Sequence, residues 1–163
     1  MRGNSRLKSL AIRLSNLEVA NRELLAIAGA LRENKGLVEL EFFYRFNVNE
    51  EMLSFLCESL KTHPTLEVLD LSSAITAGMT STDITPRMHA LLDMMKVNIS
   101  IQIIRLRAPY RPHHLFRESV IPYLERNRFW LHVLAIQQTR PIPYRTKVLG
   151  QALLAVRSDP NRF

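Results

Sequence analysis

The sequence predicts an α/β fold in which one strand-and-helix unit recurs about five times along 163 residues. Three observations predict it. A short apolar pattern recurs at nearly constant spacing, amphipathic helical patterns fill the intervals between its copies, and both patterns keep the same phase. Because the repetition covers residues 4–163, the length is better described as a run of repeats than as one domain of ordinary size.

The recurring strand pattern has three apolar positions, the second and third lying three and five residues after the first. An Asn or His stands three residues before the first position in four copies, and four residues before it in the fifth. The first positions are separated by steps of 30, 29, 35 and 30 residues. They are Leu7, Leu37, Leu66, Ile101 and Leu131. Such short alternation of apolar and other residues is typical of a β-strand with one buried face.

The intervals between the strands carry apolar residues at the i, i+3, i+4, i+7 spacing of an amphipathic helix. The matched sets are Leu24, Ala28 and Leu31; Leu53, Cys57 and Leu60; Met88, Leu91, Leu92 and Met95; and Val120, Ile121 and Leu124. These sets follow one another at the strand period. Each strand is therefore expected to be followed by a helix.

Local signals suggest where the helices begin. Asn21 and Asn49 are candidate N-caps, and Thr85-Pro86 suits an N-cap followed by the first helical residue. The six-residue excess of the 35-residue step lies within residues 72–85, which are rich in Ser, Thr and Ala. We therefore expect a loop there between strand and helix.

Pro122 lies inside the fourth helical pattern, where a proline in the helix interior would cost about 3 kcal/mol. If Ser119 is the N-cap, Pro122 falls in the first turn, where its missing N–H is unimportant. The sequence therefore predicts a short fourth helix beginning near Ser119, after a mostly irregular segment at residues 108–117.

Composition excludes several classes of protein. The one cysteine, Cys57, excludes an intramolecular disulfide and a multi-cysteine zinc cluster, and it falls on a predicted buried helix face. No apolar run reaches the ~18 residues of a membrane span, and no signal peptide precedes the first repeat, so we expect an intracellular, cytoplasmic protein. No nucleotide-binding or hydrolase motif occurs. We expect no enzyme, no cofactor and no metal site.

These strand and helix patterns, with a period near 29, resemble the leucine-rich repeat family, specifically its ribonuclease-inhibitor-like class. The resemblance implies a horseshoe-shaped solenoid segment, with parallel strands on the concave face and helices on the convex face. It also implies a scaffold for protein partners, since members of the family include enzyme inhibitors, ubiquitin-ligase substrate receptors and innate-immunity sensors.

Capping repeats are not evident at either end of the predicted array, which we expect to be a single array over residues 1–163. Solenoids need caps to avoid exposing their core. We therefore expect a segment of a longer protein that self-associates through its open ends when isolated. The alternative is a complete protein that caps itself by pairing with a second copy.

By the period of two, residues between the apolar strand positions point to the concave surface. There, three carboxylates on the second and third strands stand beside arginines on the fourth. The candidate partner-binding residues are Arg13, Glu39, Glu41, Phe43, Asp70, Arg105, Arg107 and Gln137. One interpretation is a bipolar binding face with Phe43 as an aromatic anchor. The other is that these charges are solvated and neutralise one another across the strands.

The charge distribution suggests a second candidate function. Residues 1–96 carry 11 Lys+Arg and 12 Asp+Glu (net −1), whereas residues 97–163 carry 11 and 3 (net +8), which accounts for the overall +7. Arginines interleaved with aromatic residues over residues 105–145 could hold RNA or another polyanion by phosphate pairing and base stacking. These arginines follow no single stripe, so a protein partner remains our main hypothesis.

Overall fold

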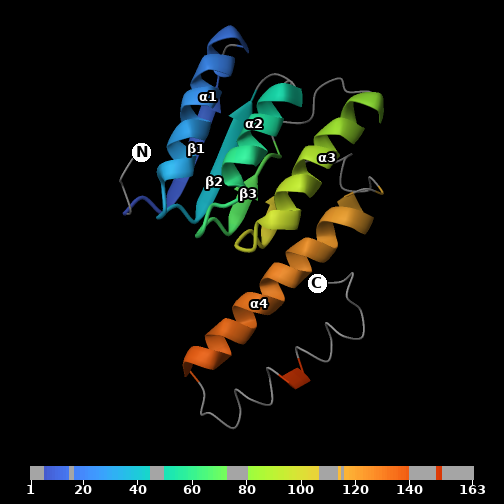
Figure 1. Ribbon diagram of the computed structural model, residues 1–163. Helices are drawn as coiled ribbons and strands as arrows, with labels where there is room; N and C mark the ends of the chain where they lie inside the picture. Colours follow the sequence, from blue (N-terminus) through green and yellow to red (C-terminus); the bar gives the residue numbers. More distant parts are fainter. Residues whose placement is uncertain are drawn as a thin grey trace.

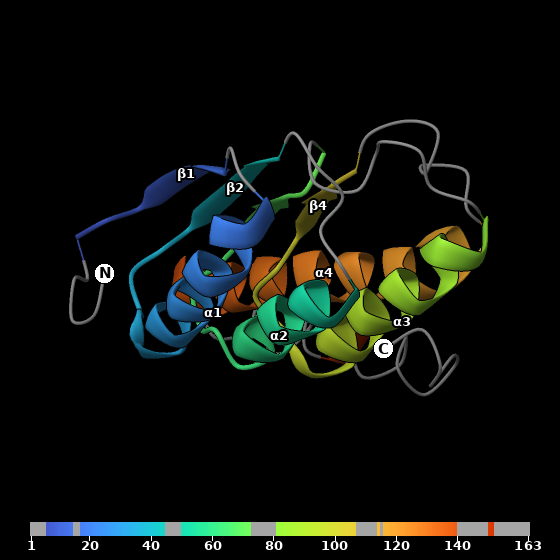
Figure 2. The same cartoon turned by 90° about the horizontal axis from the view of Figure 1, so that it is seen from above.

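The computed structural model describes residues 6–14, 17–44, 50–72, 81–106, 114, 116–139 and 150–151. Within them, four parallel strands form one sheet in chain order: β1 Ser9–Leu14, β2 Glu39–Tyr44, β3 Val68–Asp70 and β4 Ile103–Arg105. The helices α1 Leu17–Glu33, α2 Glu50–Leu60 and α3 Ser81–Val97 alternate with the strands (Figure 1). These three helices cover one face of the sheet (Figure 2). The α/β class and the parallel strands are as predicted.

The strand register follows the sequence period. Leu40 pairs with Leu10 on one side and with Leu69 on the other, and Leu69 pairs with Ile104. These four residues hold the same position in successive copies of the apolar pattern. Since side chains alternate between the two faces of a strand, this register places all the apolar positions toward the helices.

The core lies between sheet and helices and consists of rows of equivalent apolar residues. Leu37, Leu66 and Ile101 form one fully buried row, at 0% exposure each. The helix residues Leu24, Leu31, Leu53, Leu60, Leu91 and Met95 pack into the same cluster. Burying a Leu or Met side chain stabilises the folded state by about 1.5–3 kcal/mol. The rows therefore account for much of the driving force that stacks one repeat on the next.

The turns that lead into β2, β3 and β4 contain the Asn or His of the repeat pattern. The Asn34 Oδ1 accepts the backbone N–H groups of Gly36 and Leu37, both at 2.9 Å. The same arrangement is found at Asn98, whose Nδ2 also donates to the preceding turn. These side chains are buried, so they replace the water that the turn backbone would otherwise need.

The prediction of a fifth strand at residues 131–136 is wrong. These residues belong to α4, Ile121–Thr139, which is long and follows directly on a π-helical turn, η1, Phe116–Val120. Consequently Val133, Ala135 and Gln137 are helical and do not extend the sheet. The chain does not turn at Asn127, and the Asn127 Oδ1 accepts hydrogen bonds from the Arg126 side chain.

The fourth helix is also longer than predicted. Pro122 is the second residue of α4, and the wider hydrogen-bonding ring of η1 immediately before it spares the proline a clash with an ordinary preceding turn. Arg117 is in η1 rather than in a loop. The rest of the predicted irregular segment, apart from residues 114 and 116, lies outside the described residues.

Two of the three predicted helix starts are wrong. α1 begins four residues before Asn21, and α3 begins four residues before Thr85, so Thr85 and Pro86 lie inside a helix. Apolar spacing locates the buried face of a helix but does not fix the residue at which the helix begins. α2 does begin with Glu50, directly after Asn49, which itself lies outside the described residues. Most of the predicted loop, residues 73–80, lies outside them too.

Candidate partner-binding face

The open face of the sheet is the one opposite the helices (Figure 2). Within the described part of the chain, none of the helices lies over it. Its side chains are those between the apolar strand positions, and most are exposed or half-buried. They are Ser9, Ala11 and Arg13 on β1; Glu39, Glu41 and Phe43 on β2; Val68 and Asp70 on β3; and Ile103 and Arg105 on β4.

Arg105 forms ion pairs with two carboxylates of this face. Its Nη1 lies 3.2 Å from the Glu39 Oε1 and 3.5 Å from the Asp70 Oδ2. Because Glu39 is on β2 and Arg105 on β4, the guanidinium reaches across the intervening strand. Arg105 thus partly neutralises the two carboxylates across the strands, as in the second interpretation of the sequence.

Asp70 is more enclosed than a solvated carboxylate on an open sheet. It is only 6% exposed. Its Oδ1 accepts hydrogen bonds from the Ser72 backbone N–H at 2.8 Å and from the Ser72 Oγ at 2.5 Å. Asp70 therefore holds the chain where it leaves β3, which gives this residue a structural task besides its ion pair with Arg105.

The β1–β2 end of the open face has a different character. Arg13 and Phe43 are register partners, and the Arg13 guanidinium carbon lies 5.7 Å from the centre of the Phe43 ring. This is a cation–π contact at a partly exposed position. Glu41, two residues before Phe43, has no ion-pair partner among the described residues. An aromatic ring, a guanidinium and a carboxylate therefore lie on one end of the open face.

Several arginines of the predicted polyanion-binding series have partners within the protein. Arg126 is buried, donates to the carbonyls of Met95 and Asn98 at 3.0 and 2.8 Å, and lies over the Tyr123 ring at 4.8 Å. The Arg128 Nε donates to the Gln102 carbonyl at 3.0 Å. With the ion pairs of Arg105, three arginines of the series are engaged by protein acceptors. Arg107, Arg111, Arg140 and Arg145 lie outside the described residues.

The described residues offer little reactive chemistry. Cys57 is buried, and burial raises the pKa of its thiol to about 12, so the thiolate is scarce at neutral pH. No group of three or more metal-ligating side chains occurs within the described ranges. None of the helices there is long and apolar enough to cross a membrane.

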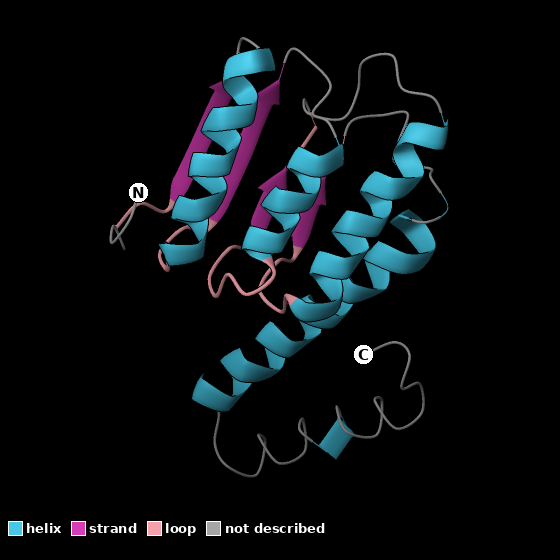
Figure 3. Ribbon diagram, turned by 45° about the horizontal axis from the view of Figure 1, so that its top comes forward, coloured by secondary structure: helices cyan, strands magenta, loops and turns pink. Residues whose placement is uncertain are grey.

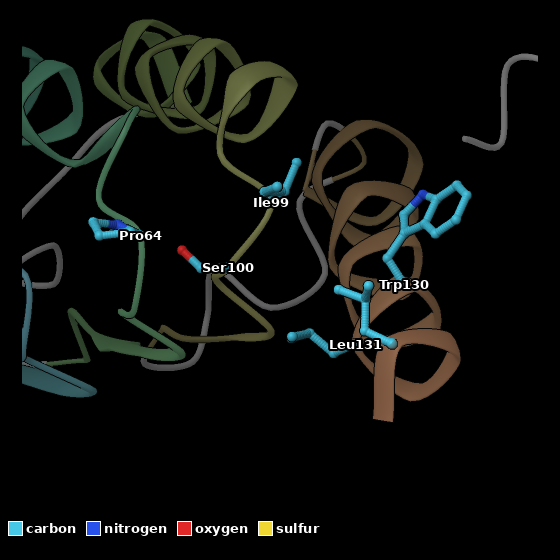
Figure 4. Close-up of a pocket in the computed structure, with 6 residues that line it drawn as sticks. Pro64, Ile99, Ser100, Trp130 and Leu131 are labelled. Carbon is cyan, nitrogen blue, oxygen red and sulfur yellow. The ribbon is translucent and has the colours of Figure 1, made fainter. Parts of the chain in front are cut away.

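An apolar groove of about 380 Å³ lies between α4 and the turns that follow α2 and α3 (Figure 4). Pro64, Ile99, Ser100, Trp130, Leu131 and Leu134 line it. The groove could not be predicted from the sequence, because the spacing of Leu131 and Leu134 predicts a fifth strand. No motif marks it, since it exists only because α4 continues past Asn127.

The open face thus collects six of the eight predicted binding residues. Arg13, Phe43 and Glu41 lie together at one end, and Glu39, Asp70 and Arg105 form the ion-paired network. Gln137 is not on this face, because it lies in α4. Arg107 lies outside the described residues. That these residues bind a partner stays a prediction.

No protein-family model matches this chain, and no curated protein matches it in sequence. Among solved structures, it is similar to the tropomodulin C-terminal domain of Caenorhabditis elegans, at 15% identity and a TM-score of 0.47. The match covers 82% of this chain and 92% of that domain.

Proposed function

We propose that this chain is a non-enzymatic interaction module, a leucine-rich-repeat array of the ribonuclease-inhibitor-like class that holds a protein partner on the open face of its sheet. The observation that carries the proposal is the cluster of Arg13, Phe43 and Glu41 on the open face. Aromatic and arginine side chains are enriched at the energetic centres of protein interfaces.

The two ends of the open face take different parts in this proposal. Arg13, Phe43 and Glu41 form the contact surface, because Arg13 is exposed and Glu41 and Phe43 are only half-buried, so all three can reach a partner. Glu39, Asp70 and Arg105 form a preorganised border, because each already has a partner within the protein. A border of paired charges selects against partners of the wrong charge pattern more than it adds affinity.

Site-specific photo-crosslinking tests this proposal. A photoreactive amino acid at position 41 is compared with the same amino acid at Ser54, an exposed residue of α2 on the opposite face. We expect one protein to be crosslinked from position 41 and not from position 54. The Phe43→Ala substitution should reduce that product at least about tenfold, because truncating an interface centre costs more than about 1.4 kcal/mol.

A charge-reversal pair supplies the matched control. Glu41→Arg changes the open face, whereas Glu125→Arg makes the same charge change on exposed helix surface in α4. Only Glu41→Arg should abolish capture of the crosslinked partner. Equal capture by both variants, or equal crosslinking from positions 41 and 54, would show that the open face is not the binding surface.

A further inference from the structure

α4 departs from the other helices at the turn residue of its repeat. α1 ends with Glu33, directly before Asn34, and α3 ends with Val97, directly before Asn98. In the same phase, α4 should end at Arg126, directly before Asn127. Instead the helix passes through Asn127 and continues to Thr139.

Asn127 nevertheless keeps one half of the contacts that a turn asparagine makes. The Asn98 Nδ2 donates to the carbonyl of His63, the turn residue of the preceding repeat. In the same way, the Asn127 Nδ2 donates to the carbonyl of Asn98 at 3.0 Å, and also to that of Ile101 at 2.8 Å. The hydrogen bonds that a turn asparagine donates to the preceding repeat are therefore present at Asn127.

The acceptor side of that fifth turn is occupied by Arg126. The Asn98 Oδ1 accepts the backbone N–H groups of Ser100 and Ile101. The Asn127 Oδ1 accepts the Arg126 Nε at 2.9 Å and the Nη2 at 2.8 Å instead. The Arg126 guanidinium thus donates to the oxygen that the backbone N–H groups of a turn would otherwise use.

Arg128 makes an equivalent replacement at the edge of the sheet. The carbonyl of Lys8 accepts the N–H groups of both Val38 and Glu39, at 2.8 and 2.9 Å, where the second strand joins the first. The carbonyls of Val38 and Glu67 repeat this pattern for the next two strands. The carbonyl of Gln102 is the next in the series, and it accepts the Arg128 Nε at 3.0 Å.

Two apolar residues of the fifth pattern, Leu131 and Leu134, are incompletely buried in the helix. Leu134 is 48% exposed, and Leu131 is half-buried. Both line the apolar groove, together with Ile99, which is 68% exposed (Figure 4). In a fifth strand, Leu131 and Leu134 would continue the buried rows of Ile101 and Ile104. The helix therefore leaves Leu131 and Leu134 incompletely buried, although it buries Val133, which is 1% exposed.

We propose that residues 128–139 are a stored fifth strand, kept helical by the guanidinium groups of Arg126 and Arg128. Releasing Asn127 and Gln102 from these two groups lets the segment unwind and pair in parallel with the edge of β4 that no strand of the described residues occupies. By the repeat phase, Val133 then lies beside Ile103. The open face gains a strand, and the groove against the turns disappears.

This inference holds whether or not the open face binds a protein, and it is tested without a partner. A cysteine pair, Ile103→Cys with Val133→Cys, reports the strand state, because neighbouring strands bring Cα atoms within disulfide reach. In the helical state the C-terminal half of α4 runs away from the sheet (Figure 3). Cys57 does not compete, since burial raises the pKa of its thiol to about 12. The control pair is Ile103→Cys with Glu125→Cys.

The releasing variant is a deletion of Arg128. It removes the donor to Gln102 and leaves two residues between Asn127 and the first apolar position, as in the other repeats. We expect the reporter pair to form its disulfide at least about tenfold faster in this variant than without the deletion. Far-UV circular dichroism should lose the helical signal of residues 128–139 and gain strand signal.

The outcomes separate the stored strand from a fixed terminal helix. Unchanged helical signal together with disulfide formation as slow as in the control pair would overturn the proposal. If the deletion variant does not fold, two proteins are tested under slow oxidation instead. One carries the reporter pair together with Arg128→Gln, which keeps the spacing, and the other carries the reporter pair alone. They must then accumulate more disulfide than the control pair, and failure to do so equally rules out the strand.

Discussion

The turns at Asn98 and His63 hold the same place in successive repeats, but they use their side chains differently. The Asn98 amide accepts two backbone N–H groups and donates to the carbonyls of Leu60 and His63. The His63 Nδ1 accepts a single N–H, from Leu66 at 3.2 Å, and its Nε2 is buried with no hydrogen-bond partner among the described residues. Both side chains are at least 96% buried, with exposures of 2% and 4%.

The difference shows what an amide contributes at this position. A short side chain with one acceptor and two donors satisfies its own turn and fastens it to the turn before, whereas an imidazole satisfies one group and leaves another desolvated. The comparison therefore predicts that the polar side chains at this edge differ widely in what they add to stability.

The largest effect is expected from Asn98→Ala. The substitution leaves the buried N–H groups of Ser100 and Ile101 without their acceptor and unfastens the turn from the preceding repeat. We expect a loss of about 3 kcal/mol in the free energy of unfolding, measured by urea denaturation. Ser54→Ala, on the exposed side of α2, should change it by less than about 0.5 kcal/mol. A loss below about 1 kcal/mol for Asn98→Ala would contradict the role given to this turn.

Much of the fold could be predicted because its determinants repeat. Leu10, Leu40, Leu69 and Ile104 share a register that follows from the spacing alone. The course of α4 could not be predicted, because it depends on which donors bind the oxygen of the turn asparagine. The residue before that asparagine is Glu33 or Val97 in two earlier repeats, but Arg126 in this one. A guanidinium that can take the asparagine oxygen changes the structure without changing the apolar pattern.

The candidate site could be predicted to about the same extent as the fold. The period of two places Arg13, Glu41 and Phe43 on the open face, where the structure has them. The ion pair between Glu39 and Arg105 was not predictable from pairing rules, since the two residues lie on strands that are not neighbours. It requires the Arg105 side chain to extend across β3, and residue type alone does not determine the conformation that a side chain adopts.

His63→Asn should change how the free energy of unfolding depends on pH. Burial lowers the pKa of His63 from 6.5, so the unfolded chain binds this proton more readily than the folded one. Wild-type stability should therefore fall as the pH drops below about 6.5, by at most about 1.4 kcal/mol per pH unit, and level off below the folded-state pKa. The His63→Asn variant should lack this component. At pH 7 it should be more stable by about 1 kcal/mol, because an Asn oxygen can accept both turn N–H groups.

His132→Asn is the matched control for that measurement. His132 is exposed on α4, so its replacement should leave the pH dependence of the wild type in place. The comparison is made by urea denaturation between pH 5 and pH 8, the range in which histidine titrates, at about constant ionic strength. Parallel curves for wild type and His63→Asn would show that the buried imidazole does not titrate differently in the folded chain.

The smallest effect is expected on the open face, from Arg105→Gln. Arg105 and Glu39 are 46% and 39% exposed, so water screens their ion pair, and Asp70 keeps its two hydrogen bonds from Ser72 when the guanidinium is removed. We expect a loss of about 0.5 kcal/mol that shrinks as salt is added, and a coupling to Glu39→Gln of less than about 1 kcal/mol in a double-mutant cycle. A loss above about 2 kcal/mol would mean that the network supports the sheet as the turn asparagines do. A small value means that charges on this face can be changed without unfolding the chain, so that binding lost by such variants is lost at the surface itself.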